Sequence, residues 1–183
     1  MTTLKESASQ TAGPYVHIGC VPSFAGLVGM YAGRDPGAEM IEGDVAGQRI
    51  ALTGCIYDGH GDAVTDALVE IWQAGPDGTF AAKGFQGWGR QPSAADTGQF
   101  SFETLKPGAI DGQAPHILVW IVARGINLGL MTRVYFPDED NADDPVFVLA
   151  GARAETMVAA ATDAGYHIDI HLQGPQETVF LDV

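Results

Sequence analysis

Two apolar runs, HILVWIV at residues 116–122 and LGLMTRVYF at residues 128–136, decide the fold of this chain. Both runs are short and rich in β-branched and aromatic residues, which favour strands over helices. A helix is also hard to fit between Pro115 and Gly125, because proline and glycine both interrupt helices. We therefore expect both runs to form central strands of a hydrophobic core.

Further strands are expected on both sides of this pair. Phe100 and Phe102 alternate with polar residues, which is the period of a strand with one buried face. Alanine, arginine, glutamate and methionine dominate residues 150–161, so this segment is the best candidate for a helix. The remaining strands are expected at 49–57, 67–74, 98–106, 166–172 and 178–181, with a solvated acidic loop at 137–145. This order predicts a mainly β fold, an antiparallel β-sandwich with a short helix.

The N-terminal part of the chain has a different character. Residues 1–14 lack hydrophobic periodicity and end in Gly13-Pro14, so they are expected to form an extended arm. Residues 21–47 are rich in glycine and predict a long loop with room for a short helical turn. We expect one domain overall, divided into an arm and loop region at 1–47 and a sandwich at 48–183.

Composition narrows the range of functions. The chain has 183 residues, the size of one domain, and is 46% hydrophobic and 17% charged, which is too apolar for disorder. No apolar run reaches the roughly 18 residues of a membrane span, and no secretory signal is recognised, so a cytoplasmic location is expected. Cys20 and Cys55 lack metal-ligand spacing and are expected in small apolar sites. A net charge of −14 disfavours nucleic acid and membrane surfaces, and an anionic substrate would need a local basic group.

One polar face has the residue types of a metal site. His167, Asp169 and His171 alternate with apolar residues, so a strand places all three on one side. Positions i and i+4 on an extended strand lie about 13 Å apart, too far for one ion to bridge. We therefore interpret them as a polar or interface face and reject a zinc site.

A more specific signal comes from three segments, WQAGPDGTF at 72–80, GQFSFETLKPG at 98–108 and APHILVW at 114–120. Together they resemble the intradiol ring-cleaving dioxygenases. In that family a ferric ion is held by two tyrosinates and two histidines within a β-sandwich, and each of the three segments contributes to the ligand set.

The resemblance implies that three of the four iron ligands are replaced in this chain. The tyrosine positions correspond to Phe80 and Ile110, and the second histidine position corresponds to Leu118. Only His116 is retained, and one imidazole does not hold ferric iron against water and chelators. These are vestigial positions, and His116 is expected to be a packed, hydrogen-bonded residue.

The segments QTAGPYVHIG at 10–19, ARGIN at 123–127 and TRVYF at 132–136 extend the resemblance to the iron-free chain of a two-chain member of the family. That resemblance implies a partner chain that holds Fe(III), further copies of the two-chain unit, and a carboxylated catechol and O2 as substrates. Residues 1–47 would pack on the partner. No catalytic residue and no metal ligand is then expected in this chain, which would supply one wall of the active site through Thr11, Gly13, Pro14 and Arg124.

Alternatives remain open for these residues. The permanent cation of Arg124 suits a substrate carboxylate in an acidic protein, but a surface ion pair is the competing interpretation. Thr11, Gly13 and Pro14 are also compatible with an arm docked on its own fold. For the whole chain, the competing hypothesis is a stand-alone sandwich module that binds an aromatic ligand near His116. An independently active iron dioxygenase is disfavoured by the missing ligands.

Overall fold

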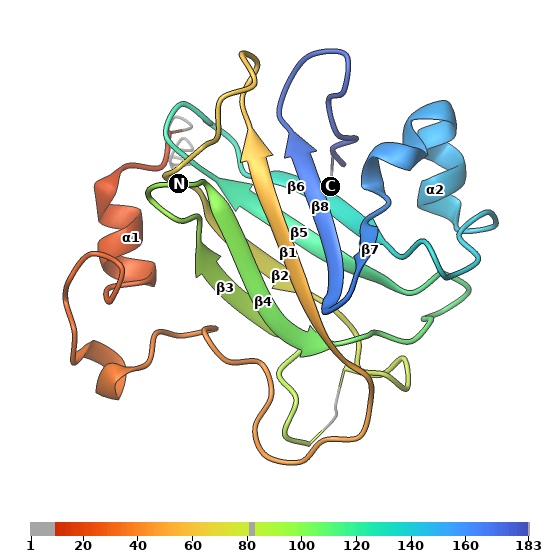
Figure 1. The fold of residues 1–183 in the computed structure, drawn as a ribbon, viewed down its shortest axis with the longest axis horizontal. Helices are drawn as coiled ribbons and strands as arrows, with labels where there is room; N and C mark the ends of the chain where they lie inside the picture. Colours follow the sequence, from red (N-terminus) through yellow and green to blue (C-terminus); the bar gives the residue numbers. More distant parts are fainter. Residues whose placement is uncertain (1–9, 81–82, 183) are drawn as a thin grey trace, which may run out of the picture.

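The computed structural model of the chain describes residues 10–80 and 83–182, which form two facing four-stranded sheets (Figure 1). The first sheet has the order β4-β1-β8-β7, with β1 (Arg49–Tyr57), β4 (Gln99–Leu105), β7 (Ala160–Thr162) and β8 (Gly165–His171). The second sheet has the order β3-β2-β5-β6, with β2 (Leu68–Trp72), β3 (Trp88–Pro92), β5 (His116–Val122) and β6 (Leu130–Tyr135). The predicted mainly β sandwich is confirmed.

The core lies between the two sheets. Ile117, Val119 and Ile121 of β5 are completely buried against it, whereas the alternate residues of this strand lie on the outer face of the second sheet. The run at 116–122 is therefore a central strand, as expected. The run at 128–136 forms β6, which lies at the edge of the second sheet, so the expectation of a central strand is wrong there. One strand pair differs from an antiparallel sandwich, because β1 and β8 run parallel.

The helix predicted at 150–161 is wrong in position. Helix α2 (Pro145–Ala150) begins five residues earlier, because Asp144 caps it by accepting from the backbone N–H groups of Val146 and Phe147. Gly151 then has a φ of 59°, and the chain continues as the 3-10 helix η2 (Gly151–Met157) before β7. The expectation of a solvated loop at 137–145 fails at its end, since Asp144 is buried.

Two strand predictions also need correction. Residues 178–181 do not form a strand, although Leu181 forms an isolated bridge with Met131. Strand β3 was missed, because WGRQP combines a glycine, two polar residues and a proline and has no apolar alternation.

The N-terminal region contributes to the same core. Residues 10–13 form neither helix nor strand and lead into α1 (Pro14–Cys20), whereas the part of the predicted arm at 1–9 lies outside the described residues. After η1 (Met30–Gly33), Met40 is 2% exposed and belongs to the main core cluster. The division at residue 47 stays a prediction. Cys55 is buried and Cys20 is partly buried.

Within the described residues, no helix is long and apolar enough to cross a membrane. Figure 1 shows α1 and α2 on opposite sides of the sandwich.

Candidate functional site

The four positions that the sequence predicts to be vestigial meet at one place on the outer face of the second sheet. Phe80 follows β2, Ile110 lies in the loop after β4, and His116 and Leu118 project from β5. These four side chains line a single cavity of about 20 Å³, together with Trp72, Gln73, Ala74 and Gly108. The structure therefore brings together residues that are 38 positions apart in sequence, from 80 to 118.

The residues around this cavity do not fit a ferric ion. Phe80 presents a hydrocarbon ring, which stacks on Trp72 at 5.9 Å, and Ile110 and Leu118 present only carbon atoms. A volume of about 20 Å³ is close to the minimum for one water molecule. No group of three potential metal-ligating side chains occurs in the described ranges 10–80 and 83–182. Stable iron sites need several donors, and this one offers a single imidazole.

His116 is held as a neutral imidazole. Its Nδ1 lies 2.8 Å from the carbonyl oxygen of Ala114, which only accepts, so Nδ1 carries the hydrogen. Burial lowers the pKa of His116, and the nearby cation of Arg133 lowers it further. The ring is thus a hydrogen-bonded packing element at neutral pH, consistent with the expectation from sequence.

A buried polar cluster lies next to His116 and was missed from sequence. The ring of Tyr135 packs 5.9 Å from that of His116, and its hydroxyl donates to Asp144 over 2.8 Å. Arg133 donates to the Tyr135 hydroxyl and pairs with the Asp144 carboxylate at 3.5 Å. Burial raises the pKa of Tyr135, so its hydroxyl stays protonated and can donate. An aspartate directly before Pro145 is a helix-start signal that could have revealed Asp144.

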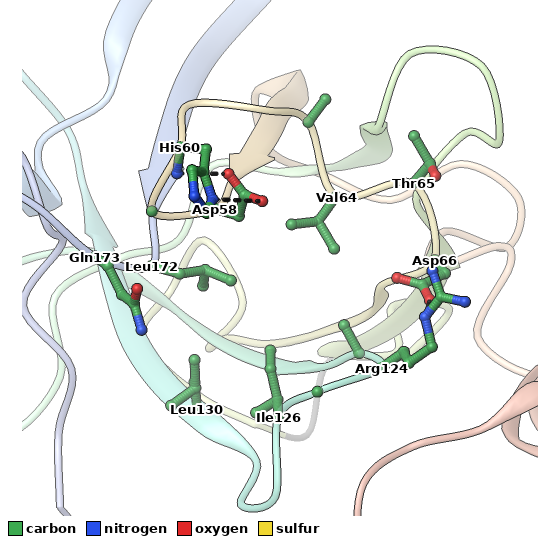
Figure 2. A pocket seen from close by; sticks show the side chains of 14 residues that line it. Asp58, His60, Val64, Thr65, Asp66, Arg124, Ile126, Leu130, Leu172 and Gln173 are labelled. Atoms are coloured by element: carbon green, nitrogen blue, oxygen red, sulfur yellow. Dashed lines mark hydrogen bonds and ion pairs between the residues drawn. The ribbon is translucent and has the colours of Figure 1, made fainter.

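Arg124 lies at a second site, at one end of the sandwich. It follows β5 and borders a pocket of about 560 Å³, between the turn that follows β1 and the turn that follows β5 (Figure 2). The side chain is 81% exposed, and its Nε lies 3.3 Å from Oδ2 of Asp66. Asp66 was not predicted, because nothing in the sequence links two loops 58 residues apart, at 66 and 124.

The N-terminal arm docks on the same turn. The Gly125 backbone N–H donates to the hydroxyl oxygen of Thr11 over 2.7 Å, and that hydroxyl lies 3.3 Å from the carbonyl oxygen of Ala123. Gly13 and Pro14 begin α1 and are not among the described residues that line the pocket. The structure thus joins Thr11 to the turn that carries Arg124, whose side chain forms the surface ion pair with Asp66.

The polar face of β8 is occupied by local contacts. His167 bonds the Thr53 hydroxyl at 2.9 Å through Nδ1 and the Asp169 carboxylate at 3.1 Å through Nε2. His171 stacks on Tyr57, with the ring centres 5.2 Å apart. Alternation along β8 places these polar residues on one face, as the sequence predicted.

Comparison with known proteins defines the class. A family model described as dioxygenase matches residues 22–174, and the chain belongs to this family, the intradiol ring-cleaving dioxygenases. An intradiol ring-cleavage dioxygenase from Tetranychus urticae shares the fold, with a TM-score of 0.59, 19% identity, and coverage of 73% of this chain and 83% of that one.

Particular relatives are much more similar in sequence. The protocatechuate 3,4-dioxygenase alpha chain of Pseudomonas putida is 38% identical, over 98% of this chain and 97% of the relative. The alpha chain from Burkholderia cepacia is 39% identical over 100% of both chains. The beta chain from Burkholderia cepacia is 32% identical over 74% of this chain and 69% of the relative.

Proposed function

We propose that this chain is the alpha chain of a protocatechuate 3,4-dioxygenase. With a beta chain that holds Fe(III), it would form an enzyme that cleaves protocatechuate between its two hydroxyl-bearing carbons. Both atoms of O2 enter the product, 3-carboxy-cis,cis-muconate. The observation that supports the proposal is the cavity around His116, which is lined by the four residues matched by sequence to the family's ligand positions, three of which carry hydrocarbon side chains.

The partner is an essential part of this proposal. The sequence similarity to an alpha chain covers the whole of this chain, and the similarity to a beta chain covers 74% of this chain. Of two homologous sandwiches, the beta chain would hold the iron and this chain would supply one wall of the active site. This pairing disfavours the alternative of a stand-alone binding module.

In the assembled enzyme this chain would contribute one wall of the active site. Arg124 is mostly exposed and lies beside the docked arm, so its charge is available to a neighbouring molecule. A guanidinium can pair with the carboxylate of protocatechuate and offset the repulsion expected from a net charge of −14. Gly13 and Pro14 would border the same wall if the arm reaches the partner.

The competing ion pair with Asp66 does not prevent this role. Exposed ion pairs contribute about 0 to 1 kcal/mol, so a substrate carboxylate in a drier pocket competes with Asp66 at low cost.

The decisive experiment compares this chain expressed alone with the chain co-expressed with its beta partner. Bound iron, the visible absorption of tyrosinate bound to iron, and turnover of protocatechuate are measured on each preparation. We expect all three only in the co-purified complex. Iron and turnover from this chain alone would refute the proposal, and so would a complex that does not form.

A further inference from the structure

The hydroxyl of Thr11 is the polar contact between the arm and the turn that carries Arg124. It accepts the Gly125 N–H at 2.7 Å, a short and well-formed bond. Its own hydrogen is shared between two carbonyl oxygens, Ala123 and Ala12, each 3.3 Å away. One side chain from the arm therefore engages the residues on both sides of Arg124.

The turn has few other restraints on the position of Arg124. Ala123 is 1% exposed and anchors one end in the core, and the Ile126 N–H closes the turn on the Ala123 carbonyl at 3.2 Å. Gly125 has a φ of 89°, a conformation that a glycine adopts without strain and can also leave easily. Within the described residues, the Arg124 side chain forms an exposed ion pair with Asp66, which restrains it weakly.

We propose that Thr11 is a positioning residue for Arg124. Its hydroxyl fixes residues 123–125 against the arm, so that the guanidinium meets the substrate carboxylate at a defined place. This inference rests on the proposed function. It assigns Thr11 the role of holding the turn of Arg124 in place, instead of a direct contact with the substrate. The arm and Arg124 then act as one unit, and docking of the arm influences the affinity for the carboxylate.

The expected effect is on binding and not on the chemical step. A single exposed hydrogen bond corresponds to a change in affinity of about three- to ten-fold. An interaction that is equal in the ground state and the transition state changes KM and leaves kcat unaltered. Thr11→Val removes the hydroxyl with little change in shape, and Thr11→Ser keeps it.

The test uses the assembled complex and two substrates, protocatechuate and catechol, which lacks the carboxylate. We expect Thr11→Val to raise KM for protocatechuate about three- to ten-fold and to leave kcat and the KM for catechol unchanged, whereas Thr11→Ser behaves as the parent. Thr162→Val is the matched control, because the Thr162 hydroxyl also accepts a glycine N–H, that of Gly165 at 3.1 Å, but lies on the turn between β7 and β8. Amide hydrogen exchange at Gly125 should accelerate in Thr11→Val but not in Thr11→Ser or Thr162→Val.

A double variant separates this inference from the proposed function. If Arg124→Ala weakens the binding of protocatechuate and of catechol equally, Arg124 does not pair with the substrate carboxylate and that part of the proposed function is refuted. The positioning role is overturned if Arg124→Ala raises KM for protocatechuate selectively but Thr11→Val does not. It is also overturned if Thr11→Val raises that KM as much in the Arg124→Ala background as in the parent. We expect Thr11→Val to add nothing once Arg124 is absent, because it acts through that side chain.

Discussion

Replacement of Asp144 by alanine should destabilise the fold more than an ordinary loop substitution. The Asp144 side chain is completely buried, with 0% of its surface exposed. Its carboxylate accepts four hydrogen bonds, from the Tyr135 hydroxyl and from the backbone N–H groups of Ala114, Val146 and Phe147, at 2.8 to 3.2 Å. It also neutralises Arg133, whose side chain is 13% exposed.

The magnitude follows from what alanine would leave behind. Loss of a helix N-cap costs about 0.5 to 2 kcal/mol, and each buried donor left without an acceptor costs about 1 to 3 kcal/mol. Removing one partner of a buried ion pair costs about 3 to 5 kcal/mol. These terms share one carboxylate and do not add. We expect a loss of about 4 kcal/mol from Asp144→Ala, a large part of the 5 to 15 kcal/mol typical of a domain.

Asp144→Asn is the matched control. The amide oxygen of asparagine can still accept from Tyr135 and the two helix N–H groups. Its NH2 group, however, would face the Ala114 N–H, which is also a donor, and the negative charge opposite Arg133 is lost. We expect about half the loss of the alanine variant. Urea denaturation of the purified chain, followed by tryptophan fluorescence, measures both values. A loss below about 1 kcal/mol for Asp144→Ala would refute the reasoning.

The same cluster predicts a pH dependence. Burial by itself would raise the pKa of Asp144, but hydrogen bonds from Tyr135 and three backbone N–H groups together lower it below its ordinary value. A carboxylate with a lowered folded pKa stabilises the fold above its unfolded pKa of about 3.9, and this contribution disappears as pH falls through the folded pKa. The stability difference between the parent and Asp144→Asn should therefore shrink below about pH 4. A difference that stays constant to pH 2 would contradict this assignment.

Three further predictions concern the site and its supports. Arg124→Ala in the assembled enzyme should weaken the binding of protocatechuate about ten-fold or more and that of catechol little, as expected for a charge-assisted contact. Steady-state kinetics with both substrates test this, and equal losses of binding would count against it. His116→Leu should leave iron content and turnover of the complex unchanged, since this imidazole is a packing element, and metal analysis would expose any loss. Gln73→Leu should cost about 2 to 3 kcal/mol in urea denaturation, because the buried amide bonds the Leu105 carbonyl at 2.7 Å and the Thr104 hydroxyl at 2.8 Å; an unchanged midpoint would argue against that bond pair.

The sheet architecture was largely predictable from sequence because it follows from local pattern. The strand at 49–57 and the strand at 116–122 have the predicted bounds, since both are short apolar runs that end at a turn, and the second alternates buried and partly exposed residues along its whole length. The error at 150–161 has a different origin: helix propensity favoured the alanine-rich segment, whereas the cap at Asp144 and Pro145 sets where the helix begins.

The candidate site was predictable only in part. Motif correspondence identified Phe80, Ile110, His116 and Leu118, and the structure brings these residues to one cavity. Asp66 was missed because it contacts Arg124 through tertiary proximity, and the helix-start signal at Asp144 and Pro145 does not reveal the contact of Asp144 with Ala114. A long-range pair of this kind leaves no periodic signal in one sequence.

The two buried clusters near the vestigial positions explain how the segments stay together without a shared metal. Ligands to one ion would join the end of β2, the loop after β4 and the start of β5. In this chain Gln73 joins the end of β2 to the end of β4, through the Leu105 carbonyl. Asp144 binds the Ala114 N–H, two residues before His116, and ties it to Tyr135 on β6. Side-chain hydrogen bonds thus hold the segments whose positions a metal would otherwise fix, so the proposed loss of the ligands would not loosen the wall that Arg124 and the arm would present to a partner.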